Sequence, residues 1–528
     1  MTDTRMDEQL HYRRQFFLGD AYLDASLEGF ATWNRREIAG RHRLSAHPDL
    51  PMTHVEHGNK SITLLGFLLD PDAPMAGDAA IVDRLCRELE KSSDLPLLTS
   101  RLGGRWVMIA HDGHETVLFH DAAGLRQVYW FQPSEPGAGM VCASQPGLIA
   151  EVFGLTIDPA ALDYVRSRGD SDWEVYWLPG DTSPYERVKA LLPNHLLQVG
   201  DADGDGDGDG GVARAVRFWP TLAVKPISYE RGLRESVLLL RGLVASAAHR
   251  YPLAVAMTAG WDSRLMLALS KQKARDLYCY TLLYPSTGHG SRDVYVPAKL
   301  LRKLDIEHHL LAYPDTVDAS FKEIAKRNGS SVHAPYCLDT QALRDHYPPE
   351  RLCLTGDVAE VVKVHYRLPA RRGERRTDRP TAAQLATVAK IDPHPFALAA
   401  FDAWLDGAPR DEPVDLIDLY CWEQMSGRWH GQIRAEYDVV QESFAPRDCR
   451  SLLVTMLAVD ESHRAGPKFR LFRDMIAELW NDVLQVPINP REKIRWKRVI
   501  ATGLKRLHVF ELIPRRAKEV VKRFSRRG

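Results

Sequence analysis

Short apolar runs separated by turn residues recur through the first 220 residues. They predict β-strands, because a strand needs only a few apolar or alternating positions and Gly or Asp at its ends favours a turn. One amphipathic stretch, IVDRLCRELEK (81–91), has helical spacing. Many strands with few helices indicate a layered, β-rich domain. The strand-like runs are SITLLGFLL (61–69), RWVMIAH (105–111), ETVLFHD (115–121), QVYWFQ (127–132) and GMVCAS (139–144).

The pattern changes between residues 230 and 360, where helical and strand-like segments alternate. Such alternation predicts a doubly wound parallel sheet, so the expected fold class is α/β overall. Ligands of such sheets bind at the carboxyl ends of the strands. Residues 414–485 read as mostly helical. The predicted helices are 232–251, 262–272 and 292–304, and the predicted strands are 253–258, 276–284, 306–312 and 350–356.

Two polar segments stand apart from these patterns. Residues 200–211 read GDADGDGDGDGG, which cannot build a core and predicts a solvated hairpin loop. A calcium loop is disfavoured because no carboxylate stands at its twelfth position. The tail 491–528 holds 14 Lys and Arg against 3 Asp and Glu, a net charge of +11. It predicts either a solvated helix or contact with an anionic membrane surface or polyanion. The expected domains are 1–220, 221–490 and this tail.

The composition and charge of the chain argue against several classes of protein. The chain has 528 residues, of which 45% are hydrophobic and 26% charged, as in ordinary globular proteins. Its net charge of −1 argues against nucleic-acid binding. No apolar run is long enough for a transmembrane helix, and the polar start lacks a signal-peptide core. The seven cysteines are scattered without a CxxC pair, which predicts reduced thiols and a cytoplasmic location.

The segment AMTAGWDSRLML (256–267) carries the clearest chemistry. A buried strand is expected to end at Thr258, a tight turn to follow at Ala259 and Gly260, and a helix to open near Asp262. This arrangement directs backbone N–H groups and a helix N-terminus into one cavity, which suits phosphate. The hydroxyls of Thr258 and Ser263 add donors, and the Asp262 carboxylate can bind magnesium. Ordinary helix capping by Asp and Ser explains the same residues equally simply.

Several segments, in order, resemble the asparagine synthetase-like (class B) ATP-dependent amide ligases. Residues 258–263 resemble the S-G-G-x-D-S pyrophosphate loop of that family. The later segments 282–311 and LTGDVAEVVKVHY (354–366) are similar to its second and third motifs. In the first domain, 101–130 and LLPNHLLQV (191–199) are similar to its glutaminase-type sandwich.

The resemblance implies a glutaminase-like (Ntn-type) sandwich followed by an N-type ATP pyrophosphatase domain. It implies ATP and Mg²⁺ as cofactors, with Asp262 and Glu360 as the metal ligands. A lysine before the late helix contacts phosphate in this family, and Lys468 is the nearest match, with Arg470 as competitor. The implied catalytic residues are Lys468, Glu360 and Asp357, and the implied cofactor-binding residues are Thr258, Ala259, Gly260, Asp262, Ser263, Leu283, Asp293 and Gly356.

The chain departs from the family pattern at several positions. The glutaminase half of asparagine synthetase uses an N-terminal cysteine, whereas the first cysteine here is Cys86, inside a predicted helix. The first domain therefore resembles the inert sandwich of β-lactam synthetases and lasso-peptide cyclases. In the third motif, Val358 replaces a glycine and Val361 replaces a glutamate. Lys468 stands one residue too far from Arg473 for the family spacing.

These observations predict an amide-forming ligase that adenylates a small-molecule or peptide carboxylate and passes it to ammonia or an amine. Glutamine is not expected to be hydrolysed. The alternative is a decayed scaffold that binds ATP weakly or not at all. A tRNA-thiolating enzyme is disfavoured, because paired catalytic cysteines and a basic charge excess are missing. The acyl substrate, the amine donor and the oligomeric state do not follow from the sequence.

Overall fold

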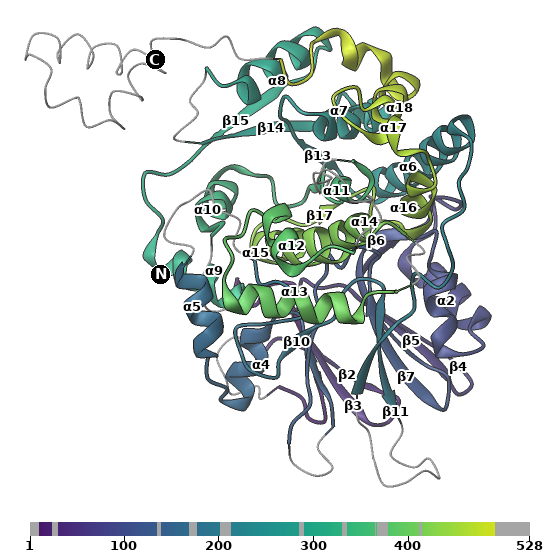
Figure 1. Ribbon diagram of the computed structural model, residues 1–528, viewed down its shortest axis with the longest axis vertical. Helices are drawn as coiled ribbons and strands as arrows, with labels where there is room; N and C mark the ends of the chain where they lie inside the picture. Colours follow the sequence, from purple (N-terminus) through teal and green to yellow (C-terminus); the bar gives the residue numbers. More distant parts are fainter. Residues whose placement is uncertain are drawn as a thin grey trace, which may run out of the picture.

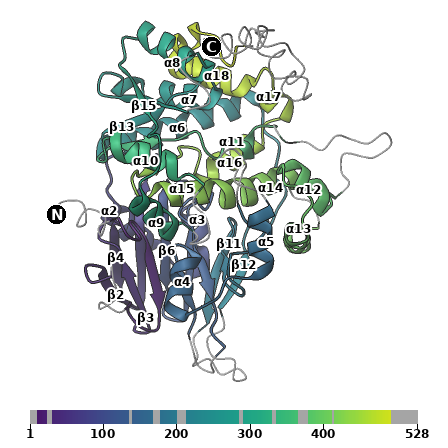
Figure 2. The same ribbon diagram turned by 90° about the vertical axis from the view of Figure 1, so that its left-hand side faces the viewer.

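Two antiparallel sheets and one parallel sheet form the framework of the protein (Figures 1 and 2). The antiparallel sheets lie at one end of the long axis, and the parallel sheet with its helices lies at the other. The computed structural model describes residues 10–23, 30–134, 139–167, 177–200, 213–284, 290–329, 335–364, 366, 379–410 and 414–490.

The antiparallel sheets have six strands each and face one another as a sandwich. The first has the order β10 (Lys189–Ala190), β8 (Tyr129–Phe131), β9 (Val141–Ala143), β1 (Phe16–Gly19), β3 (His42–Ala46) and β2 (Asn34–Ile38). The second has the order β12 (Ala213–Arg217), β11 (His195–Gly200), β7 (Glu115–His120), β6 (Gly103–His111), β5 (Lys60–Leu69) and β4 (Met52–His57).

Alternation along the strands builds the layers of this sandwich. In β1, Phe16 and Leu18 pack between the two sheets, whereas Phe17 packs on the opposite face beneath α4 (Pro146–Phe153). The outer face of the second sheet is covered in the same way by α2 (Asp78–Glu88). The predicted layered, β-rich first half is confirmed.

The third sheet is parallel, with the order β15 (His308–Ala312), β14 (Tyr278–Leu283), β13 (Leu253–Ala256), β16 (Leu352–Leu354) and β17 (Ser443–Phe444). Helices cover both faces: Leu253 and Val255 of β13 pack with α6 (Tyr229–Arg250) and α7 (Trp261–Leu269), whereas Ala254 packs on the other side. The predicted doubly wound parallel sheet is therefore confirmed. Its assignment as an ATP pyrophosphatase domain remains a prediction.

The remaining helices surround these sheets. Those before β13 are η1 (Ser92–Asp94), α3 (Leu95–Leu98) and α5 (Pro159–Ser167). Those between β13 and the loop before α12 are η2 (Lys271–Lys273), α8 (Arg292–Lys303), α9 (Ala319–Asn328), α10 (Cys337–His346) and α11 (Ala359–Val362). The last are α12 (Ala382–Val388), α13 (Pro395–Gly407), α14 (Leu416–Tyr420), the π-helix η3 (Cys421–His430), α15 (Gly431–Tyr437), α16 (Arg450–Leu457), α17 (Glu461–Arg464), α18 (Arg470–Trp480) and η4 (Asn481–Gln485).

Buried ion pairs join the sandwich to the parallel-sheet half. Arg105 on β6 binds the carboxylate of Asp438, and Arg126 Nη2 lies 3.0 Å from Glu442 Oε2. Arg14 Nε lies 3.4 Å from the same carboxylate. Burial alone would raise the pKa of Glu442, but Arg126, Arg105 and Arg14 lower it to about 2. We conclude that this carboxylate is ionised and is part of the contact between the halves.

Three further sequence predictions concern single elements or segments. All seven cysteines are buried and unbridged, as expected. No helix in the described ranges is both long and apolar enough to cross a membrane. Most of the Asp/Gly loop, residues 201–211, and the whole basic tail 491–528 lie outside the described residues.

Candidate functional site

The strand order reverses at β13, which pairs with β14 on one side and with β16 on the other. A crevice for ligands is typical of this switch point, outside the carboxyl ends of the two strands. The segment 258–263 follows β13, and Gly356 follows β16. A Cβ atom at residue 356 would lie 2.6 Å from Asp262 Cβ, so only glycine allows this approach. The predicted pyrophosphate loop and the third motif therefore meet at this edge.

Side chains within the loop hold its backbone in place. The Thr258 N–H donates to Ser263 Oγ at 3.2 Å, and the Gly260 N–H donates to Thr258 Oγ1 at 3.2 Å. The Ala259 N–H donates to Asp293 Oδ1 at 2.9 Å, which brings the predicted residue Asp293 to the loop. The strand itself ends at Ala256, two residues earlier than predicted.

The N-terminus of α7 makes no side-chain cap hydrogen bond among the described residues. Gly260 is its N-cap and provides no side-chain acceptor. The first N–H groups of a helix have no partner within the helix, and they favour an anion together with the helix dipole. Because α7 begins at Trp261, directly after the turn, this end of the helix lies within the predicted loop.

Two cationic side chains that the sequence analysis missed converge on Asp262. Lys363 Nζ binds Asp262 Oδ2, and Arg447 Nη2 lies 3.2 Å from Asp262 Oδ1. The Arg447 side chain is fully buried and also donates to the Gly356 carbonyl oxygen. Its Nε and Nη1 atoms have no hydrogen-bond partner among the described residues. Two cations therefore stand beside Asp262 at the loop.

Lys468 is not in contact with the loop in the described structure. It is exposed, directly before Phe469, whose ring centroid lies 6.0 Å from that of Trp261. The competing candidate Arg470 lies 3.5 Å from Asp474 and over the ring of Tyr229, at 4.0 Å. The geometry places neither residue beside Asp262, where Lys363 lies instead.

The two acidic candidates of the third motif differ in their surroundings. Asp357 Oδ2 accepts a 2.8 Å hydrogen bond from Thr355 and lies 3.2 Å from Arg434 Nε. Burial alone would raise the pKa of Asp357, but Arg434, His430 and the Thr355 hydroxyl hold it below its usual value. Glu360 Oε2 is buried, 3.8 Å from His430 Nε2, and accepts no hydrogen bond among the described residues.

The remaining candidates have structural surroundings. Leu283 ends β14, where it pairs with Ala312 of β15. Val361 is fully buried in the core beside Val362, so the residue at the family's glutamate position packs rather than binds. Cys86 is buried in α2, where burial raises the pKa of its thiol. This environment disfavours a thiolate nucleophile.

Two solved structures are similar to the chain, each at low identity and a low TM-score. No sequence-family model matches the chain, and no curated protein matches it. Among solved structures, the chain is similar to glutamine phosphoribosylpyrophosphate (PRPP) amidotransferase from B. subtilis, complexed with ADP and GMP. The identity is 10%, over 63% of this chain and 92% of that chain, with a TM-score of 0.24. It is similar, too, to a structure described as the allosteric regulatory enzyme of purine biosynthesis, at 12% identity, over 60% and 63% of the two chains, with a TM-score of 0.24.

Proposed function

We propose that this protein is an ATP-dependent ligase that activates a carboxylate as an acyl-adenylate and joins it to ammonia or an amine. The observation that carries the proposal is the meeting of the loop 258–263 with Gly356 at the switch point of the parallel sheet. A helix N-terminus that no described side chain caps, together with the cations Lys363 and Arg447, favours a polyanion at this place.

The proposed reaction has two steps. The substrate carboxylate attacks the α-phosphorus of ATP, which breaks the bond to pyrophosphate and forms the acyl-adenylate. The amine nitrogen then attacks the acyl carbon, loses a proton and expels AMP. The N–H groups at the start of α7 and the hydroxyls of Thr258 and Ser263 would hold pyrophosphate. Lys363 and Arg447 would stabilise the charge that develops on it.

The residues available for magnesium fit in part. Carboxylate oxygens are ligands that Mg²⁺ prefers, and Glu360 offers a buried oxygen that accepts no hydrogen bond among the described residues. Asp262 fits only if the metal takes the place of Lys363 and Arg447, because each of its oxygens faces one of these cations. Bound at Glu360, the ion would supply charge neutralisation for the leaving pyrophosphate.

Glu360 is also the better candidate base toward the amine. The lowered pKa of Asp357 makes that carboxylate a weak proton acceptor, and Arg434 occupies one of its oxygens. We propose Glu360 for metal binding or proton transfer, and Asp357 for holding Arg434 and Thr355 in place.

One observation favours the alternative of a scaffold without turnover. The pairing of Asp262 with two cations removes an anionic ligand from the place where the family resemblance puts a metal. A scaffold of this kind would bind nucleotide weakly and release no pyrophosphate. The two functions therefore differ in measurable quantities.

The test is calorimetric titration of Mg-ATP into the full chain and into Lys363→Met, with Lys303→Met as the control. Lys303 is exposed on α8 and makes no contact with the loop among the described residues. We expect the wild type and the control to bind alike, and Lys363→Met to bind about tenfold more weakly, since one charged hydrogen bond contributes roughly 1.5–3 kcal/mol.

A second measurement separates ligase from scaffold. Pyrophosphate release is followed with ATP and a panel of carboxylic acids, each with ammonia or an amine. Release that depends on one acid supports the ligase. ATP binding without release for any acid and amine supports the scaffold, and absence of ATP binding to the wild type contradicts the proposal.

A further inference from the structure

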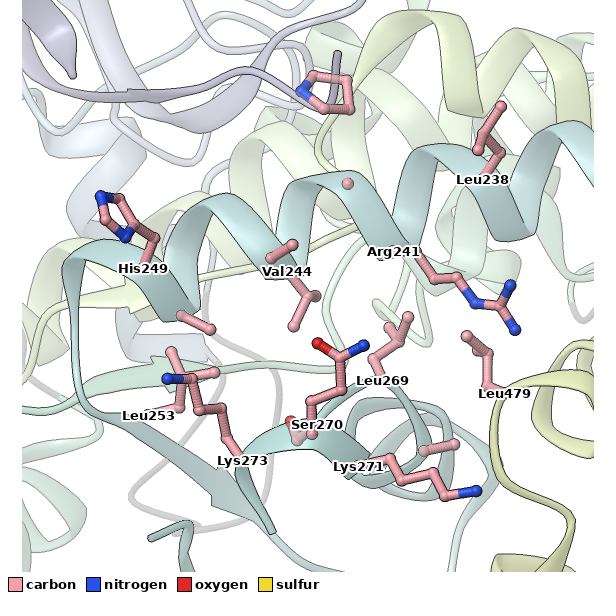
Figure 3. A pocket seen from close by; sticks show the side chains of 16 residues that line it. Leu238, Arg241, Val244, His249, Leu253, Leu269, Ser270, Lys271, Lys273 and Leu479 are labelled. Carbon is pink, nitrogen blue, oxygen red and sulfur yellow. The ribbon is translucent and has the colours of Figure 1, made fainter. Parts of the chain in front are cut away.

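A second site lies away from the loop, at the other end of α7. A cavity of about 630 Å³ opens between α6 and the segment where α7 passes into η2 (Figure 3). Leu253, the first residue of β13, lines it, so it lies at the amino end of the strand whose carboxyl end carries the loop. The nine residues of α7 span about 13 Å between the two places.

The described lining contains basic, apolar and polar side chains but no carboxylate. The cations Arg241, Lys271 and Lys273 line the cavity together with His249, and none of these four side chains pairs with an Asp or Glu among the described residues. Arg241 Nη2 donates to the backbone oxygen of Glu478, at 3.1 Å. The other lining residues are Pro71, Leu238, Gly242, Val244, Ala245, Ala248, Leu253, Ala268, Leu269, Ser270, Gln272 and Leu479.

The helix dipole accounts for only part of the positive charge that lines the cavity. His249 lies in the last turn of α6, where the helix dipole favours a cation. Arg241 lies in the middle of α6, where the dipole gives no such preference. At the mouth of the cavity, Leu238 is 64% exposed, which adds apolar surface that no described residue covers.

Lys273 stands at one end of the cavity, and Arg241 and Lys271 stand at the other. Figure 3 shows His249 and Lys273 at one end, Arg241 at the other with Lys271 below it, and Val244 and Leu269 between the ends. His249 and Arg241 are eight residues apart on one helix, which corresponds to about 12 Å.

We propose that this cavity binds an elongated organic anion with an acidic group at each end and an apolar middle. The terminal groups pair with the two sets of cations, and the middle covers the apolar wall, which water hydrates poorly. A compact dianion would leave one set of cations unpaired. A monoanion of the same length would leave the other end unpaired. The site is independent of the proposed ligase activity.

Calorimetry with three probes tests the proposal: decanedioate, with two charges and an apolar middle; decanoate, with one charge; and succinate, with two charges and a short middle. We expect decanedioate to bind most tightly. Arg241→Ala is expected to weaken decanedioate binding about tenfold, because one charged hydrogen bond is lost. Arg234→Ala, on the same helix but outside the lining, is the control and is expected to change it less than twofold.

A steric variant tests location without changing charge. Ala245 is exposed on α6 and lines the cavity between its two ends, so Ala245→Phe fills the space and is expected to abolish decanedioate binding. Lys363→Met is expected to leave it unchanged. The proposal is overturned if decanedioate does not bind, if succinate binds equally well, if Arg234→Ala weakens binding as much as Arg241→Ala, or if Ala245→Phe has no effect. It is overturned, too, if Lys363→Met removes binding, which would place the probe at the loop.

Discussion

Val358 combines an unusual backbone conformation with a buried side chain. Its φ of +68° lies in the left-handed region, which β-branched residues rarely adopt and glycine adopts freely. The side chain is nevertheless fully buried. The backbone N–H of Val358 donates to His430 Nδ1 at 3.4 Å. At Val358 a glycine-like backbone conformation therefore coincides with a side chain that packs in the core.

An alanine variant is usually more stable than a glycine variant at the same position. At Val358 we expect this order of stability to be reversed. Val358→Gly removes the left-handed strain, which costs roughly 1–2 kcal/mol for a residue with a Cβ, whereas Val358→Ala retains it. We expect the glycine variant to be at least as stable as the alanine variant in urea unfolding.

The matched control is Val361, which is equally buried but lies within α11. There glycine should be less stable than alanine by about 1 kcal/mol, the ordinary helical preference. An alanine advantage at both positions would contradict the strain at Val358.

Some residues of the candidate site could be predicted from the sequence, and others could not. Asp293 and Gly356 reach the loop as predicted, because motifs that follow neighbouring parallel strands meet at one edge. Lys363 was missed because it lies just beyond α11, as its C-cap with extended backbone, where helical spacing gives no signal. Arg447 had no comparable signal, because it follows β17, a two-residue strand too short for a periodic pattern.

At the scale of elements, α15 carries an unusual carboxyl group. Glu436 accepts hydrogen bonds from the Tyr336 N–H at 3.1 Å and from Gln432 Nε2 at 3.0 Å. Burial is the main cause that raises its pKa from 4.5 to about 8, and the nearby Asp339 raises it further, while the two hydrogen bonds lower it. The folded protein therefore holds a proton on Glu436 at neutral pH.

This proton makes stability depend on pH. Between 4.5 and about 8 the folded protein keeps a proton that the unfolded chain releases, so Glu436 destabilises the fold progressively as pH rises through that window. Glu436→Gln removes this contribution, and we expect its free energy of unfolding, relative to wild type, to rise from pH 5 to pH 8. Glu323→Gln, exposed on α9, is the control and should give a constant difference.

The long buried helix after residue 414 was predicted, but its π-helical middle was not. Local spacing predicts helix there because apolar residues recur every three or four positions. The π-helix η3 binds distant segments instead: Gln424 Oε1 accepts from the Gly180 N–H at 2.7 Å, and Trp422 Nε1 donates to the Ala122 oxygen at 2.7 Å. Partners that lie hundreds of residues away in the sequence leave no periodic signal.

At the scale of the whole molecule, the ion cluster on β6 joins two halves whose folds the sequence predicted separately. Arg105 is 1% exposed and binds Asp438, with Glu442 Oε1 3.2 Å away. Burying such groups costs desolvation energy, so a cluster of this kind stabilises only while it is complete. The sequence indicated both sheets, but it could not indicate this contact, because its partners lie more than 300 residues apart.

Removal of one partner from this buried ion cluster should strongly destabilise the folded protein. Arg105→Met leaves buried carboxylates without their cation, and we expect a loss of about 3–5 kcal/mol in urea unfolding. The double variant with Asp438→Leu should lose less than the two single losses added together, because it removes both charges.

Arg101→Met is the control, because Arg101 binds Asp72 at 2.7 Å through side chains that are about half exposed. Exposed pairs contribute at most about 1 kcal/mol, so little change is expected. Equal losses for Arg101→Met and Arg105→Met would contradict the role given to the buried cluster.

Arg447 and the adjacent residue Asp448 contact different parts of the molecule. Arg447 binds the Gly356 oxygen at the loop, while the next residue, Asp448, accepts a 2.7 Å hydrogen bond from the Ala123 N–H of the sandwich. A peptide unit is rigid and only about 3.8 Å long. One peptide unit and two side chains therefore link the Gly356 oxygen, beside the loop, to the Ala123 N–H of the sandwich.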